Sequence, residues 1–277
     1  MATGVVAKLA TRVAVDPVAN LGGQLVRYCE ALGGVVLFSF STLGWLVCRR
    51  PAKGTLLPNF FQIGVQSMPV VALTGTFIGM VLAVQSYAQF AVMGLESRLG
   101  AIINMTLVRE LGPVLAATML AGRVGSSMAA ELGTMRVTEQ IDALAVMGAN
   151  PIHYLVVPRL VACLLLIPAL TVMADFMGVA GGFFFSTVLL GVDIQHYWEH
   201  SRQVVGSFDL FSGMFKSLFF GVTIAIVSCY QGFKSDHGAE GVGRAATNAF
   251  VYSFVVILLF DLLLGISLDV IYFRLTT

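Results

Sequence analysis

The chain has 277 residues, of which 57% are hydrophobic and 11% are charged, and its mean hydropathy is +0.88. Soluble domains carry about 25% charged residues, so this composition excludes an ordinary soluble domain and indicates a polytopic membrane protein. The net charge of +1 gives no field that would attract nucleic acid. The four cysteines have no CxxC spacing and no histidine partner at ligand spacing, which favours apolar packing over a metal site or a disulfide frame.

The first 60 residues are predicted to form an N-terminal arm followed by a helix in the membrane interface. Residues 1–30 mix apolar and charged positions, which fits an amphipathic segment on the membrane surface and a solvated arm equally well. They contain no compact apolar core with a small-residue cleavage site, so we expect no removable signal peptide.

Residues 31–48 are about long enough to span a membrane, but basic residues flank both ends, with Arg27 before and Arg49 and Arg50 after. Positive residues prefer the cytoplasmic side, so a spanning helix would leave one cluster on the wrong side. A helix that stays in the cytoplasmic interface removes this conflict. We favour that interpretation over a sixth span.

Five apolar stretches downstream are predicted to cross the membrane: 64–92, 100–122, 158–190, 211–233 and 248–272. The third is long enough to be tilted or broken near Pro168. In the first, Gly75 and Gly79 have GxxxG spacing, which fits a specific dimer face and simple packing equally well. The fold class is therefore an all-α integral membrane protein, predicted to be a single domain.

The connections between these spans complete the predicted topology, with a five-span core over 64–272. Residues 191–210 are predicted to form an interfacial loop, and 234–247 another loop. Five spans place the two termini on opposite sides of the membrane. Most basic residues fall on or near the cytoplasmic side only if the N-terminus is inside, so we predict a cytoplasmic N-terminus and an external C-terminus.

Arg109 and Glu110 are adjacent charges within the otherwise apolar second stretch. Adjacent residues on a helix point about 100° apart, so these two need not pair with each other. Charges in a bilayer usually face a cavity or a partner, which favours a polar spot in a substrate cavity or at a subunit seam. The alternative is a structural pair near the membrane boundary.

The segment 131–150 is predicted to form an amphipathic helix on the cytoplasmic side, closed by Pro151. Apolar residues fall roughly on one side of this helix and polar residues mostly on the other: Met135, Ile141 and Leu144 against Glu139, Gln140 and Asp142. A solvated connector would not need exposed apolar side chains. Docking to another protein is therefore favoured over a solvated loop.

Other chemistry is weakly supported by the sequence or excluded by it. Asp175 and Asp261 lie in spans and would suit the proton relay of an ion-coupled carrier, but no basic partner can be assigned to them. His196 and His200 are four residues apart, yet no HExxH pattern supports a metal site. The chain has no GxxxxGK[ST] and no GxSxG sequence, so it contains no P-loop and no hydrolase elbow, and we assign no catalytic residue.

One long motif carries a family resemblance. Residues 107–159, LVRELGPVLAATMLAGRVGSSMAAELGTMRVTEQIDALAVMGANPIHYLVVPR, are similar to the signature of the MlaE (YrbE) family of ABC-transporter permeases. The resemblance extends over nearly the whole chain, through FIGMVLAVQ at 77–85 and GVGRAAT at 241–247. It is weakest in 1–60 and 191–210.

This resemblance implies a homodimeric permease in the bacterial inner membrane, with five transmembrane helices preceded by an interfacial helix. It implies a cytoplasmic ABC ATPase subunit that binds ATP and Mg²⁺, while this chain holds no cofactor of its own. It also implies a periplasmic partner with a lipid-binding Mce domain. The implied cargo is phospholipid, moved between the inner and outer membranes to maintain outer-membrane lipid asymmetry.

The resemblance also assigns roles to individual residues. Arg109 and Glu110 would lie beside a lipid cavity at the dimer interface, and the first span would line the same cavity with Leu82, Gln89 and Phe90. The coupling region that sits in the ATPase groove would comprise Glu131, Met135, Arg136, Thr138, Glu139, Gln140, Asp142 and Leu144.

Overall fold

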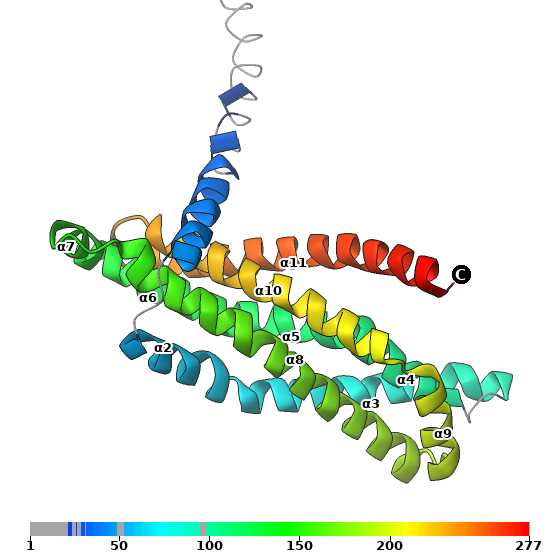
Figure 1. The fold of residues 1–277 in the computed structure, drawn as a ribbon. Helices are drawn as coiled ribbons and strands as arrows, with labels where there is room; N and C mark the ends of the chain where they lie inside the picture. Colours follow the sequence, from blue (N-terminus) through cyan, green and yellow to red (C-terminus); the bar gives the residue numbers. More distant parts are fainter. Residues whose placement is uncertain are drawn as a thin grey trace, which may run out of the picture.

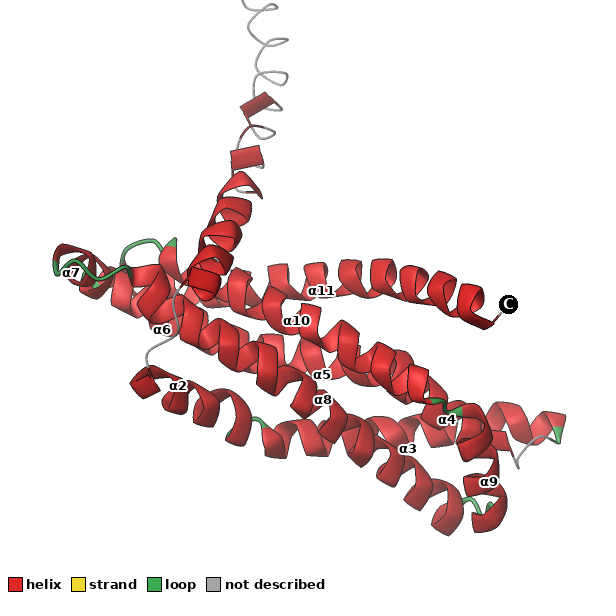
Figure 2. Ribbon diagram, in the orientation of Figure 1, coloured by secondary structure: helices red, strands yellow, loops and turns green. Residues whose placement is uncertain are grey.

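The computed structural model describes residues 22–23, 26, 29–30, 32–48, 53–94 and 98–276. Most of the predicted surface arm over 1–30, together with the flanking Arg27, Arg49 and Arg50, lies outside these residues. Within the described ranges every regular element is a helix, and no strand occurs (Figure 2).

Five helices of the described chain are long and apolar enough to cross a membrane: Gly54–Met93, Leu99–Val137, Ile152–Leu189, Ser207–Phe233 and Gly238–Arg274. This confirms the predicted all-α, five-span architecture. Several spans are composite, because single π-helical turns join α-helical pieces without breaking the helix.

The first span consists of α2 (Lys53–Phe60), η1 (Phe61–Val65) and α3 (Met68–Met93). The second consists of α4 (Leu99–Thr106), η3 (Leu107–Leu111), α5 (Gly112–Leu120), η4 (Ala121–Gly125) and α6 (Ser126–Val137). The third consists of η5 (Ile152–Val156), α8 (Val157–Phe184) and η6 (Phe185–Leu189). The last two are α10 (Ser207–Phe233) and α11 (Gly238–Thr276).

The long helices run side by side, with α3, α8, α10 and α11 following one another across the bundle (Figure 1). The second span packs behind α8 and α10. Short helices mark the two ends: α7 (Gln140–Val146) lies at one end, and α9 (Ile194–Val204) lies at the other. We refer to these as the α7 end and the α9 end.

The N-terminal helix Leu32–Cys48 is too short to count among the spans. It runs across the bundle at the α7 end rather than along it (Figure 1). One side packs against the protein through Val35, Phe38 and Leu46. The other side is apolar and exposed, with Leu37 at 72% and Val47 at 87% exposure. This arrangement confirms a non-spanning helix before the five spans, since an exposed apolar face suits the membrane interface.

Small residues let α3 and α8 approach each other closely. A Cβ atom added to Gly79 would lie 1.9 Å from the carbonyl oxygen of Gly178, and one added to Gly75 would lie 2.5 Å from that of Ala174. The GxxxG pair therefore packs within the chain, backbone against backbone. This resolves the alternative that the sequence left open.

The loop predicted for 191–210 is wrong, because most of this segment forms α9. The carboxylate of Asp193 caps that helix by accepting hydrogen bonds from the backbone N–H groups of Gln195 (2.8 Å) and His196 (3.1 Å). Tyr197 is fully buried, and its hydroxyl donates to Asn104 of α4 (3.3 Å). Burial raises the pKa of Tyr197 to about 12, so the phenol stays protonated as a donor.

Other predicted boundaries also shift. The loop expected over 234–247 is wrong, because α11 already begins at Gly238, whose φ of 86° allows the sharp turn into the helix. The first span begins at Gly54 rather than near residue 64. The third span is not broken at Pro168, since α8 continues through that residue.

Replacing Gly79 with valine should destabilise the protein, because the added atoms would collide with the α8 backbone. Overpacking of this kind costs about 1–3 kcal/mol. Gly33→Val is the matched control, because a Cβ atom at Gly33 meets nothing within 4 Å. Thermal unfolding in detergent should show a clear loss of melting temperature for Gly79→Val alone, and equal shifts for both variants would contradict the packing account.

Candidate functional site

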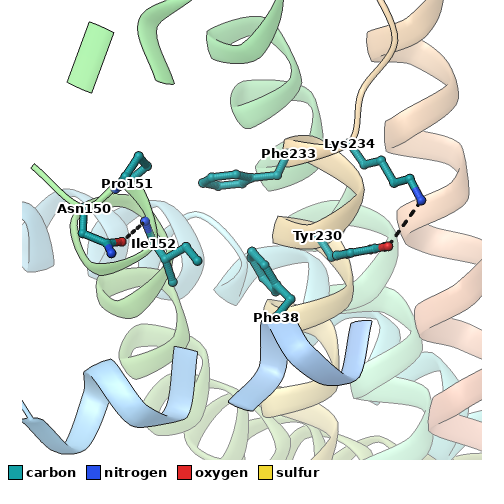
Figure 3. Close-up of a pocket in the computed structure, with 7 residues that line it drawn as sticks. All are labelled: Phe38, Asn150, Pro151, Ile152, Tyr230, Phe233 and Lys234. Carbon is teal, nitrogen blue, oxygen red and sulfur yellow. Dashed lines mark hydrogen bonds between the residues drawn. The ribbon is translucent and has the colours of Figure 1, made fainter. Parts of the chain in front are cut away.

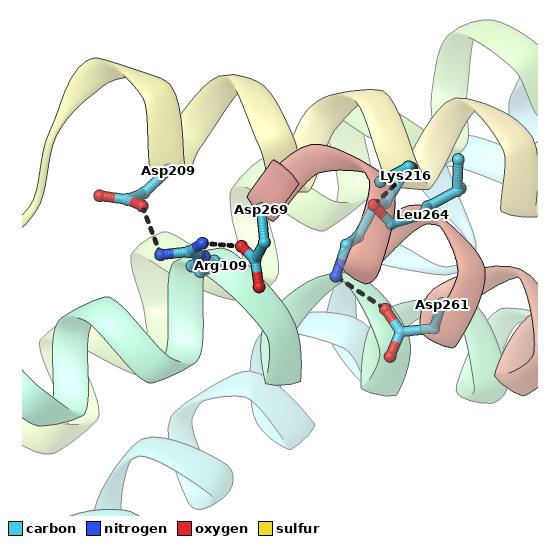
Figure 4. A network of polar contacts seen from close by, with 7 residues as sticks. Arg109, Asp209, Lys216, Asp261, Leu264 and Asp269 are labelled. Atoms are coloured by element: carbon cyan, nitrogen blue, oxygen red, sulfur yellow. Dashed lines mark hydrogen bonds and ion pairs between the residues drawn. The ribbon is translucent and has the colours of Figure 1, made fainter. Parts of the chain in front are cut away.

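Arg109 is held by two carboxylates that come from two other helices (Figure 4). It lies in η3, and its guanidinium is 3.7 Å from a carboxylate oxygen of Asp209 at the start of α10. It also forms an ion pair with Asp269 of α11 and lies 5.9 Å from the ring centre of Tyr272. One cation therefore joins the second, fourth and fifth spans at the α9 end.

A second ion pair lies close by and joins the same two partner helices (Figure 4). The ammonium group of Lys216 in α10 is 3.0 Å from a carboxylate oxygen of Asp261 in α11. The Lys216 side chain is 2% exposed, whereas that of Asp261 is 26% exposed. Because an unpaired buried ammonium is costly, Asp261 is the group that makes Lys216 tolerable within the span. We call Arg109, Asp209, Lys216, Asp261 and Asp269 the polar network.

Glu110 does not join the polar network. It is exposed, and among the residues that the structure describes it has no hydrogen-bond or ion-pair partner. Arg109 and Glu110 thus point to different surroundings, as their adjacent positions on a helix suggested. Glu110 remains available to a group outside this chain.

The three first-span residues predicted to share a cavity with this pair lie in other surroundings. Leu82 and Phe90 pack against a small apolar cluster that includes Leu99 and Ile103 of α4. Gln89 is exposed. Within one chain, then, these side chains face α4 and solvent or lipid, while Arg109 faces α10 and α11.

The single helix predicted for 131–150 is wrong. Residues up to Val137 belong to the second span, and the chain turns at Thr138 and Glu139 before α7 begins. Across this elbow, the guanidinium of Arg136 binds the carboxylate of Asp142 at 2.5 Å. Beyond α7, Gly148 has a φ of 80° and its N–H bonds to the Ala145 carbonyl, which is a glycine-terminated helix end.

Glu139 stands out at this elbow because of its backbone. Its φ is 59°, and it is the only non-glycine residue with positive φ in the described part of the chain. A glutamate in this left-handed region costs about 1–3 kcal/mol. Strain of this kind concentrates at functional sites, which agrees with its predicted place in the coupling region.

The residues assigned to the coupling region divide into inward and outward groups. Glu131 turns inward, where its carboxylate accepts from Arg159 of α8 (2.9 Å) and from Gln62 of η1 (2.6 Å). Met135 packs against a buried cluster near the start of α8, and Leu144 is half-buried. The exposed members are Arg136, Thr138, Glu139, Gln140 and Asp142.

The apolar surface of α7 differs from the one predicted. Ile141 is only 4% exposed and packs inward, whereas Val146 is 88% exposed and Met147 is 73% exposed. The break at Glu139 rotates α7 relative to α6, so the helical spacing used for the prediction does not continue across it. Exposed Val146 and Met147 therefore replace Met135 and Ile141 as the candidate docking surface.

Comparison with known proteins identifies the family. The family model described as "Permease MlaE" matches residues 56–266, which is most of the chain. The chain belongs to the MlaE permease family. MlaE-family chains are permease subunits of ABC transporters and have no ATPase domain, which agrees with the missing P-loop sequence.

Individual relatives match over most of their length. A probable ABC transporter permease protein of Rickettsia conorii is 41% identical over 88% of this chain and 95% of its own length. The intermembrane phospholipid transport system permease protein MlaE of Haemophilus influenzae is 32% identical over 90% of this chain and 96% of its own. Protein TRIGALACTOSYLDIACYLGLYCEROL 1 of Arabidopsis thaliana, a chloroplast protein, is 40% identical over 79% of this chain and 64% of its own.

Sequence reasoning missed several charged residues of this MlaE permease. Lys216 lies within the predicted span 211–233, and a lone lysine within LFSGMFKSLFF indicates that it needs a partner. Arg159 is 6% exposed and pairs with Glu131. Arg123 hydrogen-bonds Ser67 and the side chain of Gln66, so it joins the second span to the first.

The remaining candidates do not form a further centre among the residues that the structure describes. Asp175 is buried against Gly112, and no contact within the described ranges joins it to Asp261, which is paired with Lys216. His196 and His200 belong to α9, where a ring nitrogen of His200 lies 2.9 Å from the His196 carbonyl oxygen. No group of three or more metal-ligating side chains converges in the described residues.

Asp261→Asn should destabilise the permease by about 3–5 kcal/mol, because it leaves the Lys216 ammonium buried and unpaired. Asp269→Asn is the matched comparison. Asp269 is 58% exposed and Arg109 keeps Asp209, so we expect a loss of less than about 1 kcal/mol. Thermal unfolding of both variants in detergent checks this order.

The double variant Lys216→Met/Asp261→Asn should recover most of the stability lost in Asp261→Asn, since it removes the stranded charge. If Asp269→Asn proves as costly as Asp261→Asn, burial of Lys216 is not what sets the energy of the polar network.

Proposed function

We propose that this MlaE permease is the membrane-spanning subunit of an ATP-driven transporter that moves phospholipid between the inner and outer membranes and so maintains outer-membrane lipid asymmetry. It acts as a homodimer with a cytoplasmic ABC ATPase, which binds the ATP and Mg²⁺, and with a periplasmic lipid-binding protein that has an Mce domain. The printed name of the Haemophilus influenzae relative, an intermembrane phospholipid transport permease, supports this proposal.

The observation that carries the proposal is the continuity of the second span. Its helix Leu99–Val137 bears Arg109 and Glu110 near one end and leads directly into the Glu139 elbow at the other. At 1.5 Å per residue, 39 residues extend over about 58 Å. A permease without a P-loop must receive work from a partner, and this helix is the direct covalent route from α7 to the polar network.

Glu110 is the residue most available to lipid. Arg109 is already engaged by Asp209 and Asp269, whereas Glu110 is exposed and unpaired among the described residues. A carboxylate in a span needs a partner. We propose that a second copy of this chain and the amine or hydroxyl groups of a lipid head group supply one, with the lipid cavity where the two copies meet.

The charge distribution supports placing the α7 end in the cytoplasm of a bacterial cell, with the protein in the inner membrane. Arg136, Lys234 and Arg244 lie at that end, and Arg49 and Arg50 immediately precede the first span. Positive residues prefer the cytoplasmic side. The N-terminus is then cytoplasmic and the C-terminus periplasmic, because α11 ends at the α9 end (Figure 1).

Glu139→Lys should abolish co-purification of the ATPase subunit without preventing membrane insertion, because it reverses the charge at the strained elbow. Glu139→Gly separates the two properties of this residue: it relieves the left-handed backbone and removes the carboxylate. If the carboxylate makes the contact, both variants lose the ATPase. If only the turn matters, Glu139→Gly keeps it, and retention by Glu139→Lys would contradict docking at this elbow.

Met147→Asp should also release the ATPase, since it places a charge in the apolar part of the docking surface. Val204→Asp is the matched control, because Val204 is 44% exposed at the α9 end. Pull-down from detergent extracts measures both, and equal ATPase recovery with the two variants would exclude α7 as the dock.

Glu110→Ala should lower lipid transfer by about tenfold while the complex stays assembled, because one charged hydrogen bond to the head group is lost. A reconstituted assay that counts labelled phospholipid transferred per ATP hydrolysed measures this. Gln203→Ala, at an exposed position of α9, is the comparison and should keep wild-type transfer. Wild-type transfer by Glu110→Ala would remove Glu110 from the lipid site.

A further inference from the structure

A pocket of about 440 Å³ lies at the α7 end, far from the polar network. Figure 3 shows Asn150, Pro151 and Ile152 on one side and Tyr230, Phe233 and Lys234 on the other, with Phe38 of the N-terminal helix between them. Its volume falls within the range of about 300–1,000 Å³ that is common for small-molecule sites.

The walls of this pocket are mainly aromatic and apolar. The ring of Phe38 lies 5.7 Å from the rings of both Tyr230 and Phe233. Gly34 allows the N-terminal helix to come this close, since an added Cβ atom would be 2.5 Å from the Tyr230 hydroxyl oxygen. Three separate segments of the chain thus meet around an open, mainly apolar pocket.

One cation stands at the rim of the pocket. The ammonium group of Lys234 lies 3.4 Å from the Tyr230 hydroxyl and 5.6 Å from the centre of its ring. No carboxylate of the described residues lies within ion-pair distance of it. The rim therefore carries a positive charge that no carboxylate in the described part of the chain compensates.

The N-terminal helix at this pocket has the surface expected of a helix at the bilayer interface. The N-terminal helix that supplies Phe38 exposes a wholly apolar face, which includes Leu37 and Phe40 at 72% and 70% exposure. Such a face lies at the boundary between acyl chains and head groups. An aromatic pocket at this boundary fits a phospholipid. Its apolar walls suit an acyl chain, and the cation at its rim suits the phosphate of the head group.

We propose that this pocket binds one anionic phospholipid of the leaflet at the α7 end, with its phosphate on Lys234, its glycerol beside Tyr230 and its acyl chain between Phe38, Phe233 and Ile152. The site is distinct from the polar network, because Asp209 and Lys234 lie at opposite ends of α10, roughly 38 Å apart along the helix. The bound lipid fills the joint between the N-terminal helix and α10. It therefore fastens that helix to the bundle rather than serving as cargo.

The test counts lipids retained by the full-length chain. The chain is placed in nanodiscs that contain equal amounts of phosphatidylglycerol and phosphatidylcholine with the same acyl chains, and is then extracted gently for native mass spectrometry. The wild-type chain should retain one phosphatidylglycerol in preference to phosphatidylcholine. Lys234→Gln should lower that preference about fivefold, and Lys234→Arg should preserve it.

Arg202→Gln is the matched control, since Arg202 is an exposed cation at the α9 end, and it should keep the wild-type preference. Phe38→Ala should lower retention of both lipids, because it removes one apolar wall. An unchanged preference in Lys234→Gln would overturn the proposal. A truncated chain that lacks residues 1–21 provides a second test. If it retains more phosphatidylglycerol than the full chain, the proposal is also overturned, because residues 1–21 would then be what occupies the pocket. Neither outcome depends on transport, since no nucleotide or partner is present.

Discussion

The need to pair charges inside a membrane organises this structure around its second span. Each charged residue along that helix whose side chain turns inward is tied to a different neighbour: Arg109 to α10 and α11, Arg123 to the first span, and Glu131 to Arg159 of α8. An unpaired charge at these depths would be costly, so these contacts fix the position of the helix from end to end. The span thereby acts as a rigid rod between the Glu139 elbow and the polar network.

The close approach of α3 and α8 gives this rod a firm support on one side, because Gly75 and Gly79 bring backbone against backbone. The opposite side is held differently. Helix α11 exposes most of its apolar surface and is joined to α10 and η3 through Lys216–Asp261 and Arg109–Asp269.

Hydropathy and the positive-inside rule were sufficient to predict the five spans and the short helix before them. They did not predict the short helices between the spans, whose ends are set by single residues. The Asp193 cap that starts α9 and the left-handed Glu139 that separates α6 from α7 depend on single residues, and periodicity alone does not reveal them. For the site, the sequence correctly singled out Arg109 as a charge that needs partners, but the partners Asp209 and Asp269 are about 100 and 160 positions away. Pairing across such distances requires the folded structure.

We propose that this chain moves phospholipid with work supplied by a partner ATPase. Reconstituting the permease with that ATPase in vesicles, and following a labelled phospholipid into acceptor vesicles, measures this directly. Transfer should require ATP and should cease when the ATPase is replaced by a variant that binds ATP but does not hydrolyse it. Transfer driven by a proton gradient in the absence of the ATPase would contradict it and would instead support an ion-coupled carrier that uses Asp175 and Asp261.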